Sequence, residues 1–251
     1  MELEEEEVVC RSTFARTHYL YNPVTREVLP LNCKSWRCPL HQKSWLHKWR
    51  AIASFELKSH PVDRLATLTC ASECSPEQLV LAKQLLFREL RKEYGKIDYF
   101  SVLEFTTKSR LPHLHLLLRC DYINQRILSR KWLKSTTAAG IKPSPIVYIE
   151  KPRSQSGSAL YALKYALSGA EKDQAIPDSW RGRKITYSKE FFHASTSSIW
   201  QEVLKQWLGD KYSADKSDWH LLPDIPPIPR SLLISTSDGL YISRATGEII
   251  G

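Results

Sequence analysis

The sequence predicts an α+β domain in which helices pack against a central antiparallel sheet. Two apolar segments with strand-like alternation, Ile97–Phe105 and His113–Arg119, are separated by only seven residues, which predicts a hairpin. The segments around this hairpin alternate between helical and strand periodicity, an order typical of a sheet covered by helices. The 251 residues are 42% hydrophobic, which is enough apolar mass for a substantial core.

Each predicted element has a local signal. A helix over Gln42–Leu57 precedes a strand over Arg64–Cys70, whose residues alternate with period two. Ser75 as N-cap, followed by Pro76 and by Gln78 at the capping-box position, starts a helix that continues to about Tyr94. After the hairpin we expect, in order, a basic helix, a strand, a helix, a strand and an amphipathic helix, over 124–139, 145–150, 158–167, 183–188 and 197–208.

Three parts are predicted along the chain. Residues 1–60 hold an acidic N-terminus and a cysteine-containing helical segment, residues 61–208 hold the sheet, and residues 209–251 form a Pro- and Ser-rich tail whose end could form a small hairpin. No stretch approaches the roughly 18 consecutive apolar residues of a membrane-spanning helix. The acidic N-terminus also lacks the features of a secretory signal. We therefore expect a cytoplasmic protein with no membrane partner.

The charge balance is strongly basic. Lys and Arg number 36 against 27 Asp and Glu, a net charge of +9, although five glutamates stand in the first seven residues. Such a surface predicts a polyanionic partner, most often nucleic acid, whereas the alternative is solvated charge that only aids solubility. The bases that we select as DNA contacts are Arg110, Arg126, Arg130, Lys131, Lys134 and Arg183.

Cysteines cluster near the N-terminus. Cys33, Cys38 and His41 have the spacing of a tight knuckle, and zinc prefers four such ligands in a tetrahedral arrangement. Cys10 is our choice for the fourth ligand and His18 is the second choice. The alternative is a group of buried, reduced cysteines beside a surface histidine. Four protein ligands would make the zinc structural.

Two further patterns carry reactive side chains. His113 and His115 lie two apart on a strand, so both imidazoles share one face, and a hairpin brings Glu104 across from them as a third ligand for a divalent cation. A shift of one residue in register would turn Glu104 away, and an isolated His-x-His is more often surface polarity. Tyr161 and Tyr165 share a helix face with Lys164, where they could act as nucleophiles or simply pack on the sheet.

Together these motifs resemble the HUH endonucleases, and most closely the rolling-circle replication initiators of small plasmids and single-stranded DNA phages. Four segments match in the expected order, and Cys33–His41 is similar to the cysteine knuckle of plasmid initiators, with His in place of the last Cys. Arg110 stands where the family often has Gly. The resemblance covers roughly residues 10–205. The matching segments are Leu65–Thr69, Val102–Phe105 with Leu111–Leu117, Tyr161–Tyr165 and Arg181–Ser188.

The resemblance implies an HUH, ferredoxin-like nickase domain with an N-terminal zinc knuckle. Glu104, His113 and His115 would hold Mg²⁺ or Mn²⁺. Tyr161 or Tyr165 would attack single-stranded or unwound origin DNA, forming a 5′-phosphotyrosine link and freeing a 3′-OH, with Lys164 stabilising the phosphate charge. Religation would follow by the second tyrosine or by reversal.

No P-loop motif occurs in the sequence, so the resemblance implies that a host helicase and a host DNA polymerase act in trans. Two alternatives remain. The first is a transposase or relaxase of the same chemistry; a relaxase usually has a set of three histidines that is absent here, and the knuckle disfavours both enzymes. The second is a zinc-stabilised DNA-binding regulator without catalysis.

Overall fold

The computed structural model describes residues 18–22, 27–30, 36, 38, 42–70, 74–105, 111–142, 145–152, 182–208, 220–223, 233–235, 241–243 and 249–250. The chain divides into two compact units, residues 46–203 and residues 1–45 together with 204–251. Among the described residues, no helix has the length and apolar character needed to cross a bilayer.

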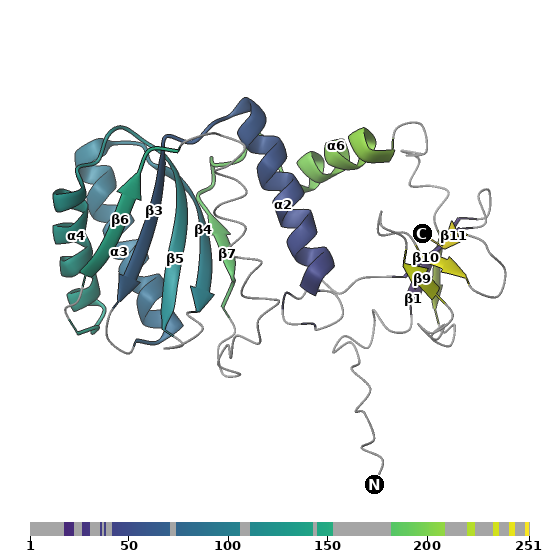
Figure 1. Cartoon of the computed structure of the whole chain (residues 1–251), viewed down its shortest axis with the longest axis horizontal. Helices are drawn as coiled ribbons and strands as arrows, with labels where there is room; N and C mark the ends of the chain where they lie inside the picture. The colour runs from purple at the N-terminus through teal and green to yellow at the C-terminus, as the bar shows by residue number, and fades with distance from the viewer. Residues whose placement is uncertain are drawn as a thin grey trace, which may run out of the picture. The chain divides into compact units, whose positions relative to one another are not determined.

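A five-stranded antiparallel sheet forms the centre of the larger unit (Figure 1). Its strands follow the order β6-β3-β5-β4-β7, so the hairpin partners β4 and β5 lie beside one another in the interior of the sheet. The arrangement confirms the predicted α+β class with a central antiparallel sheet. The strands are β3 (Arg64–Cys70), β4 (Asp98–Phe105), β5 (Pro112–Arg119), β6 (Pro145–Glu150) and β7 (Ile185–Tyr187).

The part of the chain that the structure describes contains four helices: α2 (Gln42–Ser59), α3 (Pro76–Tyr94), α4 (Gln125–Ala138) and α6 (Thr196–Leu208). The start of α3 is the predicted capping box: Gln78 N donates to Ser75 Oγ at 3.2 Å, and Ser75 N donates to the Gln78 side chain at 2.9 Å. The helix ends at Gly95, whose φ of 70° suits a residue without a Cβ.

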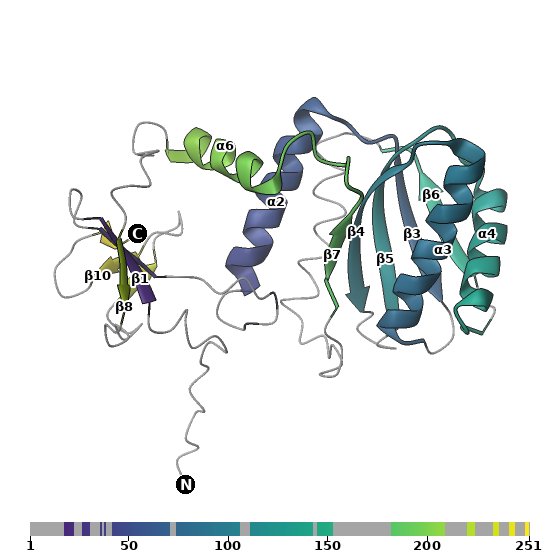
Figure 2. The same ribbon diagram turned by 180° about the vertical axis from the view of Figure 1, so that it is seen from behind.

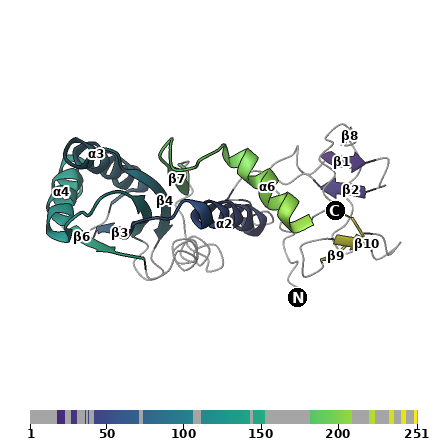
Figure 3. The ribbon, with the colours of Figure 1, turned by 90° about the horizontal axis from the view of Figure 1, so that it is seen from above.

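Alternation along the strands gives the sheet two different faces. Lys83 of α3 donates to Ser101 Oγ at 3.4 Å, so α3 covers the face on which Ser101 lies. Buried leucines such as Leu114 occupy that face too, because Leu103 pairs with Leu114 and Ser101 with Leu116. Figures 2 and 3 show α3 and α4 together on this side of the sheet. Glu104, one residue beyond Leu103, therefore lies on the opposite face.

The opposite face is partly covered by α2. The Trp49 ring lies 6.2 Å from the Phe100 ring and 5.8 Å from the Tyr187 ring, centroid to centroid. Phe100 stands four residues before Glu104 on β4 and thus on the same face, toward the other end of the strand. The contact with α2 accordingly buries one end of this face and leaves Glu104 at the other end.

The smaller unit contains two three-stranded antiparallel sheets. β1 (His18–Asn22) pairs with β2 (Glu27–Pro30) and with β8 (His220–Pro223), strands that the sequence did not predict because they are short and join distant segments. In the second sheet, β10 (Tyr241–Ser243) pairs with β9 (Leu233–Ser235) and with β11 (Ile249–Ile250). The β10–β11 pair is the small hairpin predicted within residues 240–250.

Candidate metal centre

The register of β4 and β5 brings the three predicted metal ligands together. Glu104 pairs with His113, and Val102 pairs with His115, so the carboxylate and both imidazoles lie on one face of adjacent strands. His113 Nε2 and His115 Nε2 donate to the same oxygen, Glu104 Oε2, at 2.9 Å and 2.8 Å. Three potential ligand atoms therefore lie within 4.8 Å of one another.

Burial and charge set the protonation of this group. The side chains of Glu104, His113 and His115 are 9%, 12% and 7% exposed. Burial alone would raise the pKa of Glu104, but the hydrogen bonds and charges of the two histidines outweigh it and hold the pKa at about 2. Burial lowers the pKa of His115, against the opposing effect of Glu104. An ionised carboxylate beside a neutral imidazole is the state that binds a cation.

Two neighbours complete the surroundings of the ligands. Thr67 Oγ1, on β3, lies 3.3 Å from His115 Nδ1 and so fixes the outer nitrogen of that ring. His113 Nδ1 is buried, and the described residues give it no hydrogen-bond partner. Burial lowers the pKa of Lys184, just before β7, to about 8, while the charge of Glu104 counteracts this effect. The nitrogen and oxygen donors fit a divalent cation such as Mn²⁺ or Mg²⁺.

An exposed apolar strip extends from these ligands to the edge of the sheet. Thr67 and Thr69 of β3 pair with His115 and His113 on one side, and with two residues of the edge strand β6 on the other. Those two residues are Tyr148 and Ile146, which are 50% and 54% exposed. The sequence analysis did not select Tyr148, although the alternation of β6 with one buried face would have indicated that its other face is free.

Several predicted site residues lie outside the described residues. These comprise the tyrosine motif, one predicted DNA contact and three of the four predicted zinc ligands. Cys38, the remaining zinc ligand, is described and is buried. The residues outside are Tyr161, Lys164, Tyr165, Arg110, Cys10, Cys33 and His41.

The other predicted DNA contacts lie mainly on α4. Arg126, Arg130 and Lys134 are exposed there, and Lys131 forms an ion pair with Glu93 at 2.7 Å. Because α4 packs beside α3 on the sheet face that points away from Glu104, the structure does not bring these four bases together with the metal ligands. Arg183 is also exposed, one residue before Lys184.

Comparison with known families identifies the segment that carries this site. Residues 63–170 match the family model of the replication-associated protein ORF2. This part of the chain belongs to that family. The replication-associated segment runs from just before β3 past the end of β6 and includes Glu104, His113 and His115, and the match is consistent with a rolling-circle initiator of the HUH superfamily. No curated protein and no solved structure matches the chain.

Proposed function

We propose that this protein initiates rolling-circle replication by nicking single-stranded origin DNA and later rejoining the product strand. The observation that carries the proposal is the convergence of Glu104, His113 and His115 on one sheet face inside the replication-associated segment. The five-stranded sheet would then be the scaffold of an HUH nickase. A replication-associated family favours initiation over the tasks of a transposase or relaxase.

Glu104, His113 and His115 would hold Mg²⁺ or Mn²⁺, leaving the remaining coordination positions for water and a phosphate oxygen. A bound divalent cation would supply Lewis-acid polarisation of the scissile phosphate. Thr67 keeps His115 in one orientation by contacting its outer nitrogen, since a ligand ring that cannot rotate holds its metal more tightly.

The tyrosine motif would supply the nucleophile. The phenolate oxygen of Tyr161 or Tyr165 attacks phosphorus, the bond from phosphorus to the 3′ oxygen breaks, and that oxygen takes up a proton to become the 3′-OH that primes synthesis. Lys164 would balance charge on the non-bridging oxygens. The phosphotyrosine link conserves the energy of the phosphodiester bond, so rejoining needs no nucleotide. Helicase and polymerase activities would come from host proteins.

The strip formed by Tyr148 and Ile146 is our proposed path for the DNA strand toward the metal ligands. An exposed tyrosine ring offers a surface on which a base of any sequence can stack. We also keep the proposal that Cys10, Cys33, Cys38 and His41 hold a structural zinc. Zinc analysis of the Cys38→Ser variant against the unsubstituted protein tests that ligand set, and an unchanged zinc content would exclude it.

The decisive experiment detects the covalent adduct. The protein is incubated with Mn²⁺ and a random pool of single-stranded oligonucleotides labelled at the 3′ end, because the 5′-phosphotyrosine link leaves that end on the protein. We expect a labelled protein band that is lost in His113→Ala and in the Tyr161→Phe, Tyr165→Phe double variant, with DNA binding retained. An unlabelled protein in the presence of Mn²⁺ would favour a non-catalytic DNA-binding regulator.

A further inference from the structure

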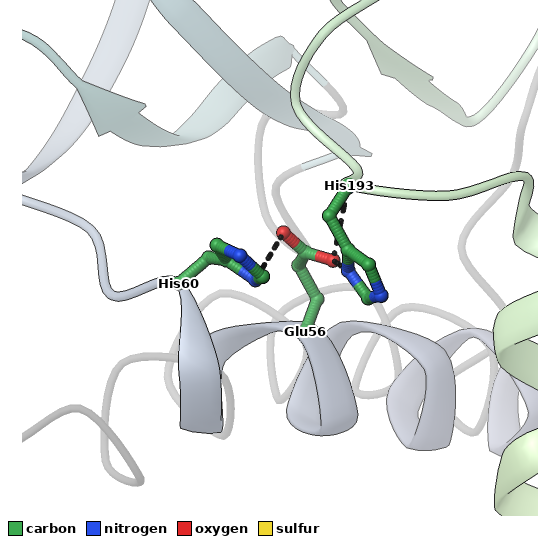
Figure 4. Close-up of side chains that lie close together, drawn as sticks. All are labelled: Glu56, His60 and His193. Carbon is green, nitrogen blue, oxygen red and sulfur yellow. Dashed lines mark hydrogen bonds and ion pairs between the residues drawn. The ribbon is translucent and has the colours of Figure 1, made fainter.

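A second group of metal-ligating side chains lies away from the Glu104 site, and we call it the Glu56 cluster. It consists of Glu56 on α2, His60 just beyond the end of that helix, and His193 in the connection between β7 and α6 (Figure 4). All three belong to the larger unit. The Glu56 side chain is fully buried, whereas the His60 and His193 side chains are 45% and 39% exposed. The sequence analysis selected none of these residues.

Both imidazoles point their Nδ1 atoms at the same carboxylate. His193 Nδ1 donates to Glu56 Oε2 at 2.6 Å, and His60 Nδ1 lies 3.4 Å from Glu56 Oε1. The two rings are stacked, with centroids 4.8 Å apart and an interplanar angle of 23°. One carboxylate oxygen and two imidazole nitrogens thus lie within 4.8 Å of one another, with the rings open to solvent on their outer side.

The surroundings hold the buried carboxylate and the chain next to His193 in place. Arg119 Nη2 donates to Glu56 Oε1 at 2.9 Å, which orients the carboxylate and leaves Oε2 directed at His193. The Arg119 guanidinium also lies over the Phe191 ring, 4.5 Å from its centroid, and donates to the Phe191 carbonyl. Phe191 is fully buried, so the backbone two residues before His193 is anchored in the core. An oriented carboxylate is an outer-shell feature of protein metal sites.

We propose that the Glu56 cluster binds a zinc ion through Glu56 Oε2, His60 Nδ1 and His193 Nδ1. Imidazole nitrogens with one carboxylate suit zinc better than magnesium, which prefers oxygen ligands. The exposed rings can turn about their side-chain bonds to direct both nitrogens at one ion, and water fills the fourth position. Binding would cross-link the end of α2 to the segment that leads into α6. Arg119 keeps its contact with Oε1, and its positive charge makes this site weaker than one without a neighbouring cation.

The test compares zinc stoichiometry among variants of the full chain. Each carries Glu104→Ala, which disables the other cluster, and then His60→Ala, His193→Ala or the control His47→Ala, an exposed histidine on α2 outside the cluster. Equilibrium dialysis against zinc followed by elemental analysis should give one zinc fewer for His60→Ala and His193→Ala than for His47→Ala. Any zinc at the cysteine knuckle is common to all variants and cancels in the comparison.

A second readout shows whether the ion binds at these rings. In protein labelled with ¹⁵N-histidine, zinc should shift the Nδ1 signals of His60 and His193 and leave those of His47 unchanged. His193→Gln, which keeps a polar group but is a poor zinc ligand, replaces His193→Ala if that variant does not fold. Equal stoichiometry in all variants, or histidine signals that do not respond to zinc, would overturn the proposal and leave an ion-pair cluster that only stabilises the fold.

Discussion

Replacing Thr67 by valine tests whether the outer hydrogen bond to His115 matters for metal binding. The change removes a hydroxyl and keeps a β-branched side chain of nearly the same size, so the central strand β3 should retain its packing. Loss of an outer-shell partner typically weakens metal binding by roughly 10- to 100-fold. Because Thr67 Oγ1 lies 3.3 Å from His115 Nδ1, a long hydrogen bond, we expect the low end of this range. That is about tenfold in the Mn²⁺ dissociation constant, or about 1.4 kcal/mol.

Thr69→Val is the matched control for this prediction. Thr69 lies on the same face of the same strand and pairs with His113 as Thr67 pairs with His115. Yet within the described residues His113 Nδ1 has no hydrogen-bond partner, so removing the Thr69 hydroxyl should leave Mn²⁺ affinity unchanged. Mn²⁺ titrations followed by electron paramagnetic resonance measure both variants, with Glu104→Ala as the baseline. Equal affinities for Thr67→Val and Thr69→Val would refute the reasoning.

Three further predictions address stability and DNA binding. Ser75→Ala removes the cap of α3 and should lower the free energy of unfolding by about 1 kcal/mol in urea denaturation, whereas an unchanged midpoint would contradict the capping role. Burial lowers the pKa of Lys83 from 10.5 to about 8, so between these pH values the unfolded chain binds a proton that the folded chain lacks. The free energy of unfolding should therefore rise with pH across this window by up to about 3 kcal/mol, a rise that is absent in Lys83→Met. Tyr148→Ala should weaken binding of a single-stranded oligonucleotide by about 1 kcal/mol or more in fluorescence anisotropy. The exposed Tyr122, at the other end of the sheet, is its control, and an equal loss in Tyr122→Ala would argue against a path along β6.

Most of the sheet was predictable because its signals are local. The capping box at Ser75 and the alternation of Arg64–Cys70 each depend on fewer than ten consecutive residues, and both elements have the predicted bounds. The sheet of β1, β2 and β8 was not predicted. It pairs His18 with Pro223, and a pairing between segments of four or five residues so far apart leaves no periodicity that a local window can detect.

The same distinction separates the two histidine clusters. His113 and His115 belong to one strand, and Glu104 reaches them across a hairpin that the sequence itself indicates, so three ligands follow from a single stretch of chain. His193 reaches Glu56 over 137 residues, and only the packing of Phe191 against the core brings it there. The four-residue spacing of Glu56 and His60 places both on one side of α2, but that spacing occurs on many helices and names no third ligand.

Position on the sheet explains why two clusters of the same composition should serve different ends. The Glu104 ligands are at most 12% exposed, yet they lie on a sheet face that continues into the exposed strip of Tyr148, so a strand of DNA can approach them along a surface. The Glu56 carboxylate is fully buried and engaged by Arg119, and only its histidines meet solvent. A cation there would join two segments of backbone and have no adjoining surface for a substrate. Catalytic chemistry is therefore best placed at Glu104, and a stabilising ion at Glu56.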